Sequence, residues 1–157
     1  MPLKLITLNT NHGGRPIEKV IDFLQKENAE IVCLQEVYNG VDSQLEDNFR
    51  SLRIFKEKLS YPYYSFFPTH AVIIDNKKAP SGNPILSKFP IIDSSFTFFN
   101  SYYQEFDFRG WFEKSDWENY IVDMVFVSKE IKIIDSYQPQ VDISDHLPLV
   151  INFSFLK

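Results

Sequence analysis

An aspartate and a histidine stand side by side where a loop meets an apolar strand near the end of the chain. Asp145 and His146 lie within residues 141–150, which read VDISDHLPLV. A carboxylate can hold a divalent cation, and an imidazole can contact phosphate or move a proton. Ser-Asp-His is also an ordinary turn before a strand, so this segment alone leaves both interpretations open.

Two apolar runs near the N-terminus also end in residues with oxygen donors. Residues 5–9 (LITLN) end in Asn9, and residues 31–36 (IVCLQE) end in Glu36. Amide and carboxylate oxygens are ligands of hard cations such as Mg²⁺. Asn9 alone could be a turn residue at a strand end. Three strands that end in Asn, Glu and Asp-His nevertheless form a constellation that could surround one ion.

Five segments stand out in order along the chain: residues 8–11 (LNTN), 29–37 (AEIVCLQEV), 81–91 (SGNPILSKFPI), 122–128 (VDMVFVS) and 144–148 (SDHLP). Together they resemble the endonuclease/exonuclease/phosphatase superfamily of Mg²⁺-dependent phosphodiesterases. The first two look like the family's strands with the metal-site Asn and the metal-binding Glu. The third and fourth are similar to its GNAILSRYPI segment and IDYIFVS strand, and the fifth to its closing motif.

The resemblance implies hydrolysis of phosphoester bonds with Mg²⁺ or Mn²⁺ as the cofactor. It makes Asn9, Glu36 and Asp145 the metal ligands. His146 would bond the scissile phosphate or handle the proton of the attacking water, with Asp123 orienting its imidazole. A carboxylate that accepts from one ring nitrogen fixes the tautomer and raises the basicity of the other nitrogen. Asp123 could instead be bonded to backbone, and Asp145 could be a turn residue.

Other polar residues are weaker candidates for the site. His12, in the glycine-bearing loop after Asn9, and Arg109 could contact substrate; a solvated loop residue and a surface ion pair are the alternatives. His70 follows Thr69, but this pair precedes residues 81–91, whereas the family's Thr-His motif follows that segment. We therefore assign His70 no role from the sequence.

The chain departs from the family pattern between residues 92 and 121. The family normally has a strand ending in Thr-His and another ending in Gly-Asp-x-Asn here, and this sequence has neither motif. About thirty residues are too few for the usual strands, helix and loops. Two functions of different class remain. The chain is a phosphodiesterase or nuclease-like hydrolase with reduced activity, or it is a catalytically inactive, truncated remnant that acts as a binding or self-associating domain.

Periodicity predicts two strand-helix units followed mainly by strands. A helix from Ile17 to near Asn28 and a second helix capped by Ser43 and Glu46 carry apolar residues at helical spacing. This order favours an α+β class. With the resemblance, it predicts one domain over residues 1–157, a sandwich of mixed β-sheets flanked by helices, with one sheet depleted by a central deletion. The expected strands are residues 3–9, 30–37 (buried on both faces), 63–67, 70–75, 84–87 after a turn-rich stretch at 76–82, 94–99, 121–127, 131–137 and 149–156.

Composition constrains partners and compartment. The formal net charge of −5 argues against a general basic surface for nucleic acid, although a nucleic-acid phosphoester remains an open substrate. The sequence contains no run of about 18 apolar residues, so it predicts no membrane span. The single cysteine, Cys33, cannot form an internal disulfide, so we expect a cytoplasmic protein. An uncovered sheet edge would favour self-association.

Overall fold

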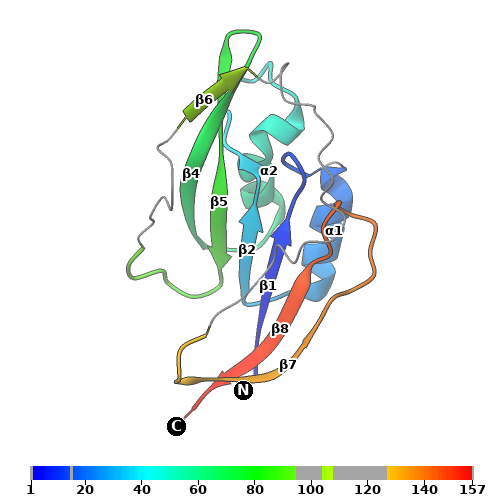
Figure 1. The fold of residues 1–157 in the computed structure, drawn as a ribbon, viewed down its shortest axis with the longest axis vertical. Coiled ribbons are helices and arrows are strands. Elements are labelled where there is room, and N and C mark those ends of the chain that lie inside the picture. The colour runs from blue at the N-terminus through cyan, green and yellow to red at the C-terminus, as the bar shows by residue number, and fades with distance from the viewer. Residues whose placement is uncertain (1, 15, 95–103, 108–126, 157) are drawn as a thin grey trace.

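The strands that the structure describes form one mixed β-sheet (Figure 1). The computed structural model describes residues 2–14, 16–94, 104–107 and 127–156. Across the sheet the order is β6-β4-β5-β2-β1-β8-β7, with β3 paired to β5 beside this row. The pairs β1/β2 and β4/β6 are parallel, and the other pairs are antiparallel. The strands are β1 (Leu3–Asn9), β2 (Ile31–Gln35), β3 (Val37–Tyr38), β4 (Tyr63–Ile74), β5 (Lys77–Ser87), β6 (Gln104–Asp107), β7 (Ile131–Tyr137) and β8 (Leu149–Phe155).

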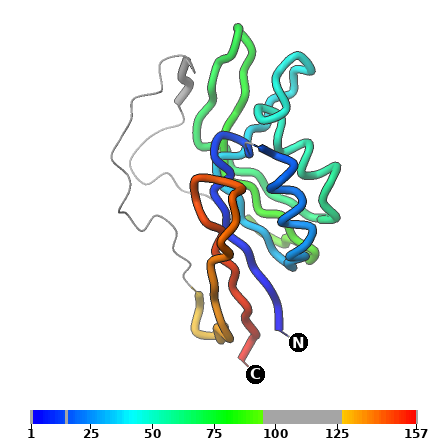
Figure 2. Tube along the Cα trace, turned by 90° about the vertical axis from the view of Figure 1, so that its right-hand side faces the viewer, coloured from blue at the N-terminus to red at the C-terminus, as the bar shows by residue number. Residues whose placement is uncertain are grey.

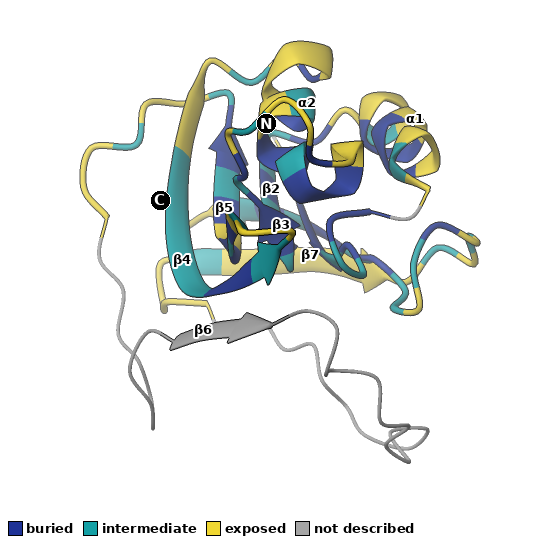
Figure 3. Cartoon of the chain, turned by 90° about the horizontal axis from the view of Figure 1, so that it is seen from above, coloured by how far each residue is buried: buried dark blue, intermediate teal, exposed yellow. Residues whose placement is uncertain are grey.

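Both helices cover the same face of the sheet. Helices α1 (Ile17–Glu27) and α2 (Ser51–Lys58) lie side by side on it (Figure 2). Figure 3 shows the buried residues gathered between these helices and the central strands. Leu24 of α1, Phe55 of α2 and Val32 of β2 belong to one buried cluster. Burial of this apolar face holds the two central strands, β1 and β2, in a fixed position.

The two faces of β2 differ in burial. Val32 and Leu34 are fully buried on the helix-covered face, whereas Ile31 and Cys33 on the other face are partly buried. The prediction of a strand buried on both faces is therefore right for the helix-covered face alone. Burial raises the pKa of the Cys33 thiol to about 11, so the thiol stays protonated at neutral pH.

Helix α1 has the limits that the sequence predicts. Pro16, in an extended conformation, precedes its first residue, and Asn28 ends it in the left-handed conformation with φ 48°. The backbone N–H of Asn28 donates to the Leu24 carbonyl at 3.0 Å. Such a left-handed residue satisfies a carbonyl at the end of a helix.

The predicted cap of the second helix is wrong. Helix α2 begins at Ser51, after a 3₁₀ turn (Asp47–Arg50), and no side-chain hydrogen bond caps it at Ser43. The apolar spacing was nevertheless informative, because Leu45, Phe49 and Phe55 are all buried. A 3₁₀ turn has three residues per turn, so it keeps the same side roughly inward without continuing the α-helix.

The turn predicted at residues 76–82 is also wrong, and so is the division of residues 63–75 into two strands. Strand β4 is continuous apart from a change of register between Pro68 and His70, and β5 starts already at Lys77. Asp75 and Asn76, with φ 47° and 62°, form the two-residue turn between them. Gly82 lies inside β5, where only glycine fits, because a Cβ at this position would be 2.1 Å from the Phe67 carbonyl oxygen.

The α+β class, with a mixed sheet flanked by helices, is confirmed. Strands β1, β7 and β8 lie at the predicted residues 3–9, 131–137 and 149–156, within one residue at their ends. The predicted strands 94–99 and 121–127 fall outside the described residues, apart from Ser94 and Val127. Among the helices that the structure describes, none is long and apolar enough to span a membrane.

Replacing Phe55 by Ala should lower the free energy of unfolding by about 3–5 kcal/mol, because loss of a buried ring leaves a cavity. Phe55 is fully buried, whereas Phe89 is 45% exposed. The matched variant Phe89→Ala should therefore cost about 1 kcal/mol or less. Urea unfolding followed by circular dichroism measures both. Equal losses would contradict the position of the core.

Candidate active site

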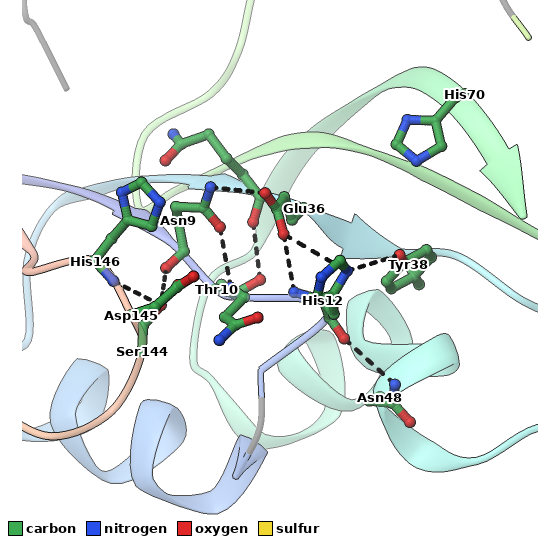
Figure 4. A network of polar contacts seen from close by, with 12 residues as sticks. Asn9, Thr10, His12, Glu36, Tyr38, Asn48, His70, Ser144, Asp145 and His146 are labelled. Atoms are coloured by element: carbon green, nitrogen blue, oxygen red, sulfur yellow. Dashed lines mark hydrogen bonds and ion pairs between the residues drawn. The ribbon is translucent and has the colours of Figure 1, made fainter. Parts of the chain in front are cut away.

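Three segments meet at one edge of the sheet. Strands β1 and β2 are parallel, with Asn9 opposite Gln35, so their carboxyl ends lie together. Strand β8 is antiparallel to β1 and begins with Leu149 opposite Thr7, which brings the loop before it to the same edge. Figure 4 shows Asn9, Glu36 and His146 within this arrangement.

Glu36 lies between β2 and β3 in the left-handed conformation, with φ 58°. Its Oε1 accepts from the Asn9 side-chain amide at 2.9 Å, and its Oε2 accepts from the His12 backbone N–H at 3.0 Å. The side chain is 40% exposed. A non-glycine residue in this conformation needs such contacts to hold it, and they orient the carboxylate at the edge of the sheet.

The loop after β1 is held against β2 by its backbone and side chains. Thr10 is fully buried, and both its N–H and its hydroxyl donate to the Gln35 carbonyl, at 3.1 and 2.8 Å. The Asn11 N–H donates to the Asn9 Oδ1 at 3.0 Å. Asn11 and His12 both have φ 50°, so the chain turns sharply and presents His12 next to Glu36.

His12 is fixed from the side of β3 and the 3₁₀ turn. Its Nδ1 lies 3.5 Å from the Tyr38 hydroxyl and 3.9 Å from the Glu36 Oε2. The Asn48 side-chain amide donates to the His12 carbonyl at 3.3 Å. Gly13, with φ +87°, allows close contact, because a Cβ there would lie 2.1 Å from the Asn48 carbonyl oxygen.

The loop before β8 is held by contacts of residues 142–144. Ile143 is buried in the core, and Lys19 of α1 binds the Asp142 carboxylate at 3.2 Å. The Ser144 hydroxyl donates to the Asn9 carbonyl at 2.7 Å and accepts from the His146 N–H at 3.3 Å. This anchoring places His146 next to the end of β1.

The structure brings five of the seven predicted site residues into this region. Asn9, Glu36, His12, Asp145 and His146 surround the ends of β1 and β2 (Figure 4). Asp145 is exposed, and its Oδ1 lies 3.1 Å from the Ser144 hydroxyl. The other two predicted residues, Asp123 and Arg109, lie outside the described residues.

His70 of β4 lies near the candidate site residues, and the charges of Glu36 and His12 act on its imidazole (Figure 4). Burial lowers the pKa of His70, while the Glu36 carboxylate raises it and His12 lowers it. Its Nδ1 is 3.1 Å from the Thr69 hydroxyl. The imidazole of His70 is thus electrostatically linked to Glu36, although the sequence order gave it no role.

The donor set at the strand ends fits a hard cation of the Mg²⁺ type. Each Glu36 oxygen accepts one hydrogen bond, and a carboxylate has about four acceptor positions, so both oxygens retain room for a ligand bond. The described residues contain no group of three His, Cys, Asp or Glu side chains suited to one metal ion. A structural Zn²⁺ site needs four such ligands, whereas Mg²⁺ takes one or two carboxylates and keeps waters.

Sequence reasoning missed the residues that hold the site together. Ser144 connects the two loops, Thr10 ties β1 to β2, and Tyr38 and Asn48 hold His12. Ser144 stands within the Ser-Asp-His motif, which was a usable signal for it. Tyr38 and Asn48 carried no such signal, because their contacts depend on how the 3₁₀ turn packs.

The chain is similar to known proteins of one family. The model of the Endonuclease/Exonuclease/phosphatase family matches residues 6–146. No curated protein matches the chain. Among solved structures, the chain is similar to an endonuclease/exonuclease/phosphatase from Beutenbergia cavernae, with 16% identity and a TM-score of 0.46 over 59% of this chain and 28% of that one. It is also similar to an endonuclease/exonuclease/phosphatase family protein from Leptotrichia buccalis, with 14% identity and a TM-score of 0.39 over 58% and 39%. The chain therefore spans well under half of either structure.

Gly13→Ala should destabilise the protein by about 1–3 kcal/mol more than Gly14→Ala, because overpacking adds to backbone strain only at the first position. Both glycines have positive φ, 87° and 84°, but a Cβ at Gly14 would meet its nearest neighbour, Ile17, at an ordinary 3.4 Å. Urea unfolding of the two variants gives the difference. Equal destabilisation would mean that contact with Asn48 does not hold the His12 loop.

Proposed function

Because the chain belongs to the endonuclease/exonuclease/phosphatase family, we propose that it is a metal-dependent phosphodiesterase that hydrolyses phosphoester bonds at the ends of β1 and β2. One observation carries the proposal. Hydrogen bonds from Ser144 to Asn9 and from Asn9 to Glu36 join three distant segments that each supply a residue suited to phosphoester chemistry. Residues 1–157 would form one domain of this kind in the cytoplasm.

Glu36 and Asn9 would hold Mg²⁺ or Mn²⁺, with the exposed carboxylate of Asp145 on the side of the β8 loop. A bound divalent cation supplies stabilisation of negative charge on the phosphoryl oxygens. The Asn9 amide already has a defined orientation, because its Oδ1 accepts from Asn11 and its Nδ2 donates to Glu36. The protein thus fixes the oxygen donors before a ligand arrives.

His146 would donate a hydrogen bond to a phosphate oxygen or accept the proton of the attacking water. The Ser144 hydroxyl accepts from the His146 backbone N–H and donates to the Asn9 carbonyl, so the backbone of His146 is fixed beside Asn9. Asp123 would orient the imidazole. His12, held by Tyr38 and Asn48, would contact the substrate, and Arg109 is a further candidate for the phosphate.

Wild-type protein should hydrolyse bis-p-nitrophenyl phosphate in the presence of Mg²⁺ or Mn²⁺ and lose this activity with EDTA. His146→Asn should lower kcat by about 100-fold or more, the usual contribution of proton transfer. Glu36→Gln should raise the Mg²⁺ concentration needed for half-maximal rate, because it removes a ligand charge. Release of p-nitrophenol measures both.

Glu18→Gln on the exposed side of α1 is the matched control for Glu36→Gln, and it should leave the rate and the Mg²⁺ dependence unchanged. Rates that stay at the wild-type level in both His146→Asn and Glu36→Gln would eliminate this active site. Hydrolysis that persists in EDTA would contradict the proposed requirement for a divalent cation.

A second candidate function is self-association through β7, the last strand in the order of the described sheet. Among the described strands, β7 pairs with β8 alone, and its residues from Lys132 to Tyr137 are exposed. Ile134 is 48% exposed. An edge strand with apolar side chains invites pairing with a second copy of the chain.

The charges on β7 suit an antiparallel copy. The register shift between Ile133 and Asp135 places Lys132 opposite Ser154 and Asp135 opposite Asn152, so that Lys132 and Asp135 lie on the same face. In an antiparallel pair of β7 strands, Lys132 of each copy would lie beside Asp135 of the other. Opposite charges in such cross-strand positions are favourable.

Ile134→Lys should shift the protein to monomer, since it adds charge at the centre of the edge. Ile92→Lys is the control, because Ile92 is 96% exposed and lies outside the described strands. Sedimentation velocity over a wide range of concentration measures the effect. A wild-type protein that is monomeric throughout this range would contradict self-association.

A further inference from the structure

A pocket of about 630 Å³ lies between helix α2 and strand β4, away from the candidate active site. Pockets that bind small ligands have volumes of about 300–1,000 Å³. This pocket therefore has room for a group the size of a nucleotide. Its walls include Arg53, Lys56 and Glu57 of α2, and Tyr64, Ser65 and Phe66 of β4.

The helical wall of the pocket is basic in an acidic protein. Within α2, Arg53, Lys56 and Lys58 oppose the single acidic residue Glu57, although the whole chain has a formal net charge of −5. Arg53, Lys56 and Glu57 line the pocket, so its helical wall carries one net positive charge. A local positive potential of this kind attracts anions even when the total charge is negative.

Each of the two cationic side chains contacts another side chain that lines the pocket. The Lys56 Nζ lies 3.9 Å from the centre of the Tyr64 ring, a cation–π contact. The Arg53 Nε donates to the Glu57 Oε1 at 2.7 Å. The terminal nitrogens of the guanidinium carry further N–H groups that can bond phosphate oxygens.

The opposite wall supplies aromatic surface. Tyr64 is 46% exposed, and Phe66 lies two residues further along the same face of β4. Aromatic rings beside cations are the combination by which proteins bind single-stranded nucleic acid, with bases on the rings and phosphates on the cations. Asn39 and Ser65 also line the pocket.

Strand β3 and the residue after it connect the candidate active site with the pocket. Asn39 lines the pocket and follows Tyr38, whose hydroxyl contacts His12. The Tyr38 N–H also donates to the Ser51 hydroxyl at the first residue of α2, at 3.0 Å. The helix that carries Arg53 and Lys56 is thereby fixed relative to the loop that carries His12.

We propose that this pocket binds a nucleotide unit of a single-stranded nucleic acid, outside the residues that would carry hydrolysis. The proposal rests on the proposed function and deepens it by naming nucleic acid as the substrate class. DNA and RNA share the chemistry that the pocket recognises, namely phosphate and a flat base. Contacts to two phosphates predict that affinity falls about sevenfold between about 50 and 200 mM salt, from the slope for single strands.

The test is fluorescence anisotropy in EDTA with labelled oligothymidylate and oligouridylate of about twelve residues, within the site sizes of strand-binding folds. Lys56→Gln should weaken binding and reduce the salt dependence, because one phosphate contact is lost. Tyr64→Leu should weaken it about tenfold through loss of stacking. Lys26→Gln on the exposed side of α1 is the charge-matched control and should bind as wild type does.

Several outcomes would overturn the proposal: no binding of either strand, equal affinity in wild type, Lys56→Gln and Tyr64→Leu, or binding of 5′-AMP without either strand. Tyr64 and Lys56 lie at the surface, so both variants should fold, and circular dichroism checks this. Because EDTA removes divalent cations, binding is measured independently of hydrolysis. Protein that hydrolyses bis-p-nitrophenyl phosphate but binds no strand refutes the pocket alone, and protein that binds strands without hydrolysis refutes the proposed function alone.

Discussion

The hydrogen bond from the Ser144 hydroxyl to the Asn9 carbonyl joins residues that are 135 positions apart in the chain. It has this effect because β8 is antiparallel to β1, so the loop before β8 reaches the end of β1. The parallel pairing of β1 with β2 then adds Glu36. The arrangement of the site therefore depends on the central strands and on the helices that bury one face of them.

Much of the fold could be predicted from local patterns. The alternation in β1 and β8 and the helical spacing of α1 each reflect burial of one face, which sequence periodicity records directly. The hairpin from β4 to β5 could not be read in this way, because Pro80 and Gly82 look like turn residues and yet lie inside a strand. Gly82 is small because another strand passes close to it, a constraint that appears only in three dimensions.

The placement of the candidate site residues was predictable where a motif coincides with the end of a strand. Asn9, Glu36 and His146 each follow or precede an apolar run, and the topology alone brings such ends together. The support for His12 was not predictable, because it comes from Tyr38 and Asn48 through the packing of a 3₁₀ turn. The pocket beside α2 likewise depends on which residues of β4 face the helix.

Glu36 has a left-handed backbone conformation, with φ 58°. Most residues are strained in this conformation, whereas glycine and asparagine adopt it readily. A chain selected for thermal resistance alone would tend to replace this glutamate with one of those two residues. The acidic group and the relaxed backbone thus compete for a single position. Replacing Glu36 with glycine or asparagine would relax the backbone but remove the carboxylate, so stabilised versions that keep the glutamate would have to gain their rigidity elsewhere.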